Sequence, residues 1–141
     1  SDSTKEIEES FPDIIKFVES RYRVLKGKNY RAVAGLSMGG RQSCALSLAH
    51  PDTFGYVGMF SGVVPPSSQE DEARYAAVFK NAPKLYWMGV GSADGVKANY
   101  DKERAFLDSK GYKYEYYESD GGHIWRNWRV YLTIFAQKIF K

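Results

Sequence analysis

Cysteine is almost absent from this sequence, because Cys44 is the only one among its 141 residues. One thiol cannot form a disulfide within the chain, and a cysteine-rich metal site is excluded as well. Long apolar runs are also missing: none approaches the roughly 20 residues of a membrane-spanning helix. The segment over residues 1–10 lacks the apolar core of a signal peptide. We therefore expect no membrane partner. A single cysteine indicates neither an oxidising nor a reducing compartment for the protein.

A strong excess of one charge sign is lacking too. Lys and Arg total 20 against 17 Asp and Glu, which gives a net charge of +3, and the basic residues are scattered. The densest basic stretch, Arg126 to Arg129, is interrupted by Asn127 and Trp128. This pattern favours a solvated helix face over a phosphate-binding patch, so we expect no nucleic-acid partner.

The residues that are present suit a globular domain. Hydrophobic residues make up 43% of the chain, aromatic residues 16% and charged residues 26%. A chain of this length has room for one core. Because we find neither an internal repeat nor a domain boundary, residues 1–141 are predicted to form one unit.

Helical patterns and short apolar runs alternate along the chain. A first amphipathic helix is predicted to start near Thr4 or Ser10, with Pro12 in its first turn, and to be closed by Gly27. Further helices are expected over 41–49, 72–79, 100–109 and 125–140, and strands over 30–34, 56–60, 84–90 and 112–117. This alternation indicates an α/β fold of about four mostly parallel strands with helices on both faces.

The segment Gly35-Leu36-Ser37-Met38-Gly39 matches G-x-S-x-G and lies between a predicted strand and a predicted helix. Such a turn strains the serine backbone and exposes its hydroxyl above the sheet, and we expect small residues at Gly35 and Gly39 to permit the close approach. Ser37 is therefore the predicted nucleophile. The helix that begins at Met38 points free N–H groups toward the serine, so the Met38 amide is a predicted oxyanion donor.

A serine hydroxyl needs a base, and the sequence offers two histidines. His50 ends a predicted helix before Pro51, where it caps carbonyl groups. His123 lies in a loop between the last strand and the last helix, from which an imidazole reaches the carboxyl ends of the strands. A solvated side chain is the alternative for a loop histidine. The companion serine leads us to predict His123 as the general base.

The base needs a carboxylate that fixes its tautomer. The chain order Ser, acid, His restricts this acid to positions 38–122, and the geometry requires a loop at the carboxyl end of a strand. Asp94 meets both conditions. Asp120 is the rival, but it lies three positions from His123 on one tight turn and is poorly placed to reach the far ring nitrogen.

Four stretches carry a resemblance to a known family: YRAVAGLSMGG, HPDTFGYVGMFSG, YWMGVGSAD and ESDGGHIWRNWRVYL. From about Ile14 onward the chain resembles the carboxyl-terminal half of the esterase D and carbohydrate esterase branch of the α/β-hydrolases, which includes feruloyl and acetyl xylan esterases. The resemblance implies a serine esterase that hydrolyses carboxylic esters, such as carbohydrate-linked feruloyl or acetyl esters, without cofactor or metal. It also implies an extracellular or periplasmic location.

The sequence departs from this family at its beginning. A complete member has several strands before the nucleophile strand, and the loop after the third of them supplies a second oxyanion N–H. We therefore expect 1–141 to be the carboxyl-terminal catalytic half of such a domain. The strand over 30–34 would then present an unpaired apolar edge that pairs with a missing amino-terminal half or with a second copy. With one oxyanion donor absent, the isolated chain is expected to be weakly active or inactive.

Other functions stay open at this point. A thioesterase, a small-ester hydrolase or an acyltransferase would use the same residues, and a non-catalytic interaction module would use the fold alone. Trp125 and Trp128 flank the His123 loop, where an indole would stack on a sugar ring or an aromatic acyl group, or belong to the core. Residues 60–62, at the end of another predicted strand, reach the same pocket and receive no assigned role.

Overall fold

The computed structural model describes residues 2–141, with side chains from residue 5 onward. Its centre is one four-stranded sheet in the order β1-β2-β3-β4, in which every neighbouring pair is parallel. The strands are β1 (Ala32–Leu36), β2 (Tyr56–Phe60), β3 (Leu85–Gly91) and β4 (Glu115–Ser119). The predicted α/β class and the four parallel strands are confirmed.

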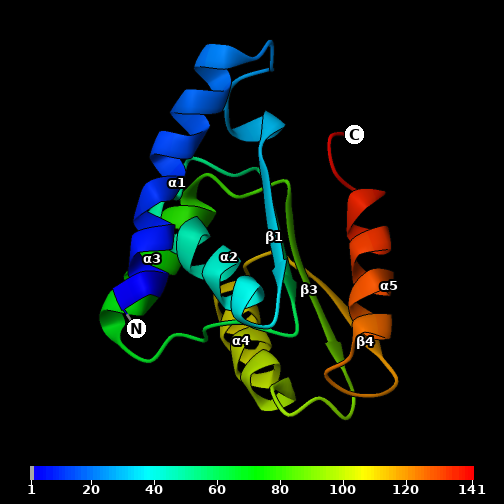
Figure 1. The fold of residues 1–141 in the computed structure, drawn as a ribbon. Helices are drawn as coiled ribbons and strands as arrows, with labels where there is room; N and C mark the ends of the chain where they lie inside the picture. Colours follow the sequence, from blue (N-terminus) through cyan, green and yellow to red (C-terminus); the bar gives the residue numbers. More distant parts are fainter. Residues whose placement is uncertain (1) are drawn as a thin grey trace.

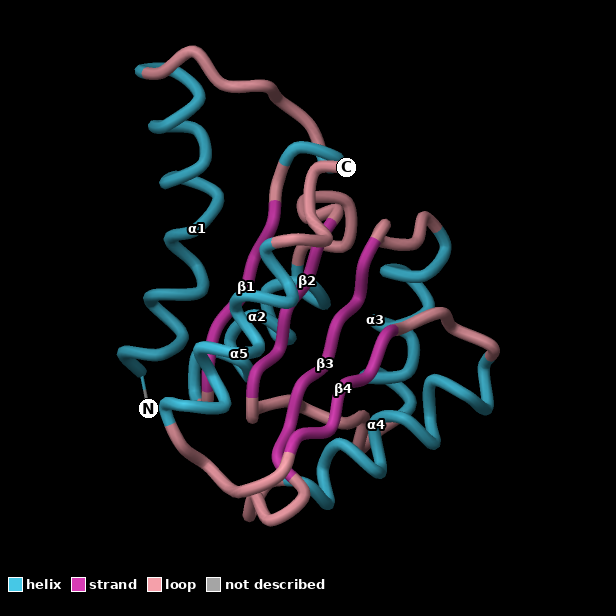
Figure 2. Tube along the Cα trace, turned by 90° about the vertical axis from the view of Figure 1, so that its right-hand side faces the viewer, coloured by secondary structure: helices cyan, strands magenta, loops and turns pink. Residues whose placement is uncertain are grey.

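Helices cover both faces of this sheet, as predicted (Figures 1 and 2). One face carries α1 (Asp2–Arg21), α2 (Met38–Ala49), α3 (Gln69–Lys80) and α4 (Lys97–Lys110), and the other carries α5 (Trp125–Ala136). A short 3-10 helix, Lys28–Tyr30, precedes β1. Among the described helices, none combines the length and the apolar character that crossing a bilayer requires.

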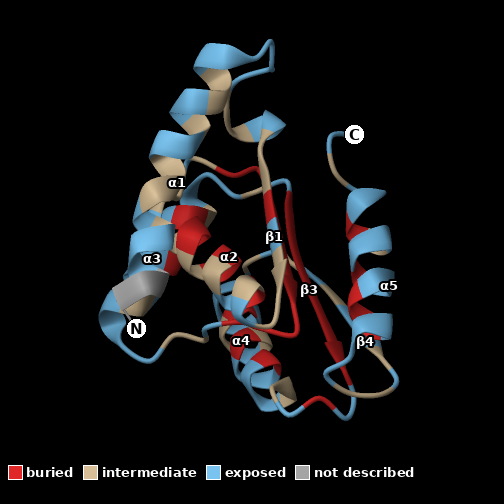
Figure 3. Cartoon of the chain, viewed as in Figure 1, coloured by how far each residue is buried: buried red, intermediate tan, exposed pale blue. Residues whose placement is uncertain are grey.

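The core forms two layers because alternate strand residues point to opposite faces. Met88 packs with α2, α3 and α4, whereas its neighbour Trp87 packs against α5. All residues of β2 and β3 are buried, which fits parallel strands covered on both sides (Figure 3). The strand β1 is at an edge of the sheet, and of its five residues only Val33 is buried.

Several predicted boundaries were wrong. Pro12 lies inside α1 and not in its first turn, and α1 ends at Arg21, well before Gly27. Phe11 and Ile15 pack against the core on either side of the proline, so burial of this apolar face offsets the lost helical hydrogen bond. At the other end of the chain, α5 stops at Ala136 instead of continuing to Phe140.

Candidate active site

Ser37 is the single residue between β1 and α2, and its backbone is strained. Its φ of 53° lies in the left-handed region, which L-residues other than Asn and Asp rarely occupy. The surroundings hold this conformation: the Ser37 N–H donates to the Phe60 carbonyl at 2.7 Å, and the Ser37 carbonyl accepts from Gly40 and Arg41. The strained serine turn expected from the motif is therefore present.

The close packing around this turn depends on glycine at some positions only. A Cβ on Gly35 would clash with the backbone of Gly39, and one on Gly62 would clash with the Ser37 carbonyl. Gly39 itself has open space around a built Cβ, so the expectation that Gly39 must be small for strand and helix to approach was wrong. The two positions differ because a Cβ on the strand residue Gly35 meets the helix backbone, whereas one on Gly39 meets no neighbouring segment of the chain within 4 Å.

The structure brings Ser37, Asp94 and His123 together at the carboxyl ends of β1, β3 and β4. His123 Nε2 lies 2.8 Å from Ser37 Oγ, and His123 Nδ1 lies 3.1 Å from each carboxylate oxygen of Asp94. A carboxylate only accepts hydrogen bonds, so Nδ1–H donates to Asp94 and Nε2 accepts from the serine hydroxyl. The imidazole thus has the tautomer that proton removal from Ser37 requires.

Asp94 is fixed in a position that Asp120 does not share. Its side chain is fully buried, and its Oδ1 also accepts a hydrogen bond from the Val96 N–H at 3.1 Å. Asp120 is exposed and contacts the site through its backbone carbonyl, which accepts from Asn127. Of the two carboxylates considered from the sequence, the structure therefore places Asp94 against the imidazole.

The loops that carry Asp94 and His123 are bonded directly to each other. The Ala93 N–H donates to the Gly121 carbonyl at 2.9 Å, and Ser92 N–H donates to the Ser119 carbonyl at 2.8 Å. From α5, the buried Asn127 amide donates to the carbonyls of Asp120 and Gly122 at 2.9 and 3.0 Å. Sequence reasoning gave Asn127 no role, although it shares the buried stripe of α5 with Tyr131 and Phe135, and that pattern was the available signal.

Comparison with known proteins identifies the family. The family model described as "Putative esterase" matches residues 12–138. This chain belongs to that esterase family.

Individual relatives of this esterase-family chain agree with the fold and are longer than it. It is 30% identical over 131 residues to the endo-1,4-beta-xylanase/feruloyl esterase of Xylanibacter ruminicola, covering 92% of this chain and 17% of that protein. It is 37% identical over 67 residues, 48% of this chain and 17% of the other, to the diacylglycerol acyltransferase/mycolyltransferase Ag85A of Mycobacterium leprae. The CE1 ferulic acid esterase of Anaeromyces mucronatus superimposes with a TM-score of 0.77 at 24% identity, covering 97% of this chain and 54% of that one. The chain thus spans about half of that structure and about a sixth of both curated relatives.

The esterase-family chain also presents a helix end to Ser37. Met38 is the first residue of α2, and a helix has no carbonyl of its own for its first N–H groups. Those of Gly40 and Arg41 donate to the Ser37 carbonyl, whereas the Met38 N–H comes before them. The positive end of the helix dipole lies at the same place. This arrangement favours a developing negative charge beside the serine oxygen. His50, by contrast, is at the opposite end of α2, as its carboxyl-terminal cap.

The two tryptophans beside the His123 loop differ in setting. Trp128 is buried, and its ring centroid lies 4.9 Å from that of His123 at an interplanar angle of 86°. Trp125 is 63% exposed and packs edge-on against Trp128 at 5.1 Å. The sequence left two possibilities for these tryptophans, stacking on a substrate ring or packing in the core. In the structure Trp128 packs in the core against the imidazole, and Trp125 faces outward.

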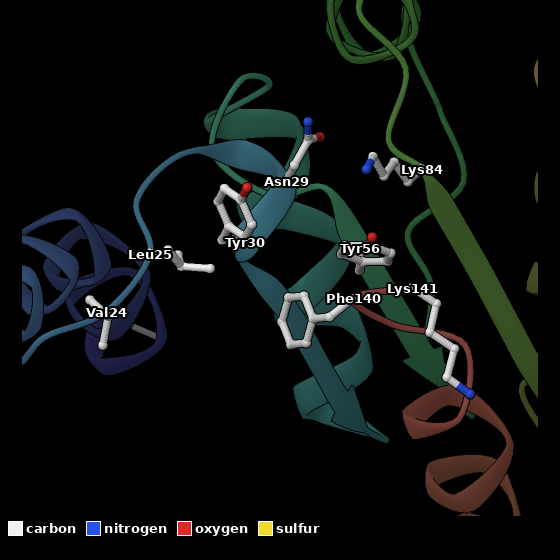
Figure 4. Close-up of a pocket in the computed structure, with 8 residues that line it drawn as sticks. All are labelled: Val24, Leu25, Asn29, Tyr30, Tyr56, Lys84, Phe140 and Lys141. Atoms are coloured by element: carbon white, nitrogen blue, oxygen red, sulfur yellow. The ribbon is translucent and has the colours of Figure 1, made fainter.

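A hollow at the other end of the sheet is separate from this site. It has a volume of about 490 Å³ and includes Tyr30, Tyr56, Lys84 and Phe140 in its lining (Figure 4). Tyr56 and Lys84 stand at the amino ends of β2 and β3, whereas Ser37 and Asp94 follow the carboxyl ends of strands. Within residues 5–141, no three His, Cys, Asp or Glu side chains gather into a possible metal site.

Proposed function

We propose that this chain carries the active site of a serine esterase that hydrolyses carboxylic esters through an acyl-serine intermediate. One observation supports this most strongly: a single imidazole bonds the Ser37 hydroxyl at 2.8 Å on one side and the buried Asp94 on the other. Membership of the esterase family supports the same reaction class. Asp94 acts as the orienting acid, His123 as the general base and Ser37 as the nucleophile.

In the proposed mechanism, Ser37 Oγ attacks the ester carbonyl carbon while its proton passes to His123 Nε2. The Met38 amide donates a hydrogen bond to the oxyanion that forms, and Asp94 stabilises the imidazolium. Collapse of the tetrahedral intermediate breaks the bond to the leaving alcohol, which takes the proton from Nε2. Water then attacks the acyl-serine with His123 again as base, and the acid is released.

We propose carbohydrate-linked acyl esters, such as feruloyl or acetyl esters, as the substrate class. The support is the similarity over 92% of the chain to a protein named as a feruloyl esterase. The exposed Trp125 beside the site offers an aromatic surface of the kind on which sugar rings and aromatic acids stack. Feruloyl and acetyl esters of xylo-oligosaccharides are the substrates to compare with p-nitrophenyl acetate.

An acyltransferase is the second candidate, because part of the chain is 37% identical to a protein named as an acyltransferase. Transfer and hydrolysis share the acyl-serine and differ in whether an alcohol or water removes the acyl group. Product analysis in the presence of a sugar alcohol separates them. Acylated sugar in excess over free acid supports transfer, whereas free acid alone supports hydrolysis.

We also propose that the outer edge of β1 pairs with a further polypeptide segment, so that this chain acts as the carboxyl-terminal catalytic half of an α/β-hydrolase domain. The edge residue Ala34 is exposed, and an apolar hollow of about 240 Å³ lies beside it, with Leu36, Trp125 and Leu132 in its lining. An open apolar strand edge favours strand addition. The partner is the complementary part of such a domain or a second copy. A dilute monomer with full secondary structure in sedimentation contradicts this.

A fluorophosphonate probe tests the esterase proposal, because it reacts with an activated serine. We expect stoichiometric labelling at Ser37 that is lost in Ser37→Ala and in His123→Ala. The matched control is His50→Ala, which removes the other histidine, at the far end of α2, and should label normally. Absence of labelling in the presence of the complementary part of the domain, or labelling that survives His123→Ala, contradicts the proposal.

A further inference from the structure

Ser61 has an unusual backbone for a buried serine. It follows the last residue of β2, is 1% exposed, and has a φ of 51°. Its N–H donates to the Gly89 carbonyl at 2.8 Å, which ties it to β3. Ser37, after the end of the neighbouring strand, also has a positive φ, of 53°. Non-glycine residues held this way cluster at functional sites, and Ser61 lies one strand away from Ser37.

That hydroxyl has a specific partner on α5. The Trp128 indole Nε1–H donates to Ser61 Oγ at 3.0 Å, and the indole is 8% exposed. An indole N–H is a donor only, and a buried one without an acceptor is unfavourable. The bond therefore fixes how the indole plane lies between β2 and the His123 loop. The same indole meets the imidazole edge-to-face at 4.9 Å.

The imidazole of His123 can turn about its Cβ–Cγ bond, and such a turn points the lone pair on Nε2 away from the serine. Its hydrogen bonds act at Nδ1 and Nε2, on either side of Cε1. The side chain is 37% exposed. The edge-to-face contact with Trp128 therefore limits this turn together with the two hydrogen bonds.

We propose that Ser61 and Trp128 form one positioning unit for His123, in which the serine fixes the indole and the indole fixes the plane of the imidazole. Both are positioning residues, because neither reaches the reacting atoms. The expected effect on rate rests on the proposed esterase function. The expected effect on the imidazole does not rest on that function. The positioning proposal and the esterase proposal can therefore fail separately.

The first test observes the His123 ring directly by ¹⁵N NMR of the whole chain, with His50→Gln as the background so that one histidine remains. We expect the parent to show a single Nδ1–H tautomer with a slowly exchanging ring proton. In Ser61→Ala and in Trp128→Phe this proton signal should broaden and the two tautomers should mix. Ser61→Gly is a second variant, since glycine adopts a positive φ freely and should fold while lacking the hydroxyl.

The matched control is Ser119→Ala. It removes the 2.6 Å hydrogen bond between the Ser119 and Tyr131 hydroxyls, which also joins a serine at a strand end to an aromatic residue of α5. The hydrogen bonds and the ring contact of His123 involve Asp94, Ser37 and Trp128 and not this pair, so the control spectrum should equal that of the parent. A spectrum that changes equally in Ser119→Ala means that general loosening of α5 is responsible and overturns the proposal.

The second test measures the rate of fluorophosphonate labelling and the hydrolysis of p-nitrophenyl acetate. We expect labelling and kcat to fall about tenfold in Ser61→Ala and in Trp128→Phe, with KM unchanged, because a slightly misplaced base slows proton transfer without affecting binding. The double variant should be within twofold of Trp128→Phe, since the hydrogen bond is already lost there. Full additivity, or parent-like rates with parent-like spectra, overturns the positioning unit. A parent that does not label even in the presence of the complementary part of the domain, with spectra that change as expected, overturns the esterase proposal alone.

Discussion

Tyr75 and Glu103 are joined by a buried hydrogen bond in which the tyrosine donates. The Tyr75 hydroxyl donates to Glu103 Oε1 at 2.6 Å, and it also lies 2.9 Å from the Val64 carbonyl. Burial raises the pKa of Glu103 from 4.5 to about 8, and the Tyr75 hydrogen bond lowers it by less. Glu103 is therefore protonated in the folded chain below about pH 8.

This buried acid predicts that stability falls as the pH rises. The unfolded chain releases the Glu103 proton near pH 4.5, while the folded chain keeps it until about pH 8. The contribution of Glu103 is therefore fully present below pH 4.5 and is lost progressively up to about pH 8. Its loss should amount to about 3–5 kcal/mol in the free energy of unfolding, measured by urea denaturation at pH 5 and pH 8.

Glu103→Gln isolates this effect, because the amide is neutral at every pH and its oxygen can accept from Tyr75 as the carboxyl oxygen does. The difference in unfolding free energy between pH 5 and pH 8 should be smaller in this variant than in the parent. At pH 8 the variant should have the higher free energy of unfolding. Glu6→Gln is the control, since Glu6 is exposed. If the parent and Glu103→Gln show the same pH dependence, Glu103 is ionised in the folded chain and the proton assignment is wrong.

Glycine substitutions around Ser37 should separate into two classes. Gly35→Ala and Gly62→Ala force a Cβ into backbone atoms and should each destabilise the chain by about 3 kcal/mol. Gly39→Ala finds open space within α2 and should leave stability equal or raise it by up to about 1 kcal/mol. Thermal unfolding of the three variants checks this order. A Gly39→Ala variant as unstable as Gly35→Ala would contradict the open space around position 39 and show that β1 and α2 pack tightly there as well.

Much of the fold could be predicted from local sequence pattern. The strand boundaries that could not be predicted are set by contacts with distant segments of the same chain. The strand predicted over 30–34 lies at Ala32–Leu36, because Gly35 and Leu36 continue in register with Met59 and Phe60. Read alone, Gly35 belongs to the turn. Tyr112 was assigned to the last strand, yet its ring stacks on Phe79 at 4.4 Å and the strand begins at Glu115. Strand register and ring stacking are properties of two segments that lie far apart in the sequence.

The three polar residues at the candidate site were predictable because chemistry restricts them strongly. A G-x-S-x-G turn, two histidines and the chain order left few choices for Ser37, Asp94 and His123. Ser61 and Asn127 carry no such restriction. A serine after a strand and an asparagine in a helix are common, and their importance comes from an indole and two carbonyls that only the fold brings near.

Asn127 gives a test of how the His123 loop is held. Asn127→Ala removes both hydrogen bonds that this buried amide donates to the carbonyls of Asp120 and Gly122, which should cost about 1–3 kcal/mol of stability. Hydrogen exchange of the amides between Gly121 and His123 should accelerate more than that of amides in β2. Asn99→Ala, an exposed position on α4, is the control and should change neither. Uniform acceleration across the sheet would mean that Asn127 stabilises the whole fold and not this loop.

The identity of the orienting acid is tested by Asp94→Asn against Asp120→Asn. The amide at position 94 keeps the size of the carboxyl group, but its NH₂ group opposes the Nδ1–H of His123 and favours the other tautomer, in which Nε2 no longer accepts from Ser37. We expect the rate of fluorophosphonate labelling to fall by about 10⁴-fold, as for triads in general. Asp120→Asn leaves the backbone carbonyl that Asn127 binds in place and should label at the parent rate. A larger loss in Asp120→Asn than in Asp94→Asn would assign the acid to position 120, because a carboxylate that sets the tautomer cannot be replaced by a neutral amide without this loss.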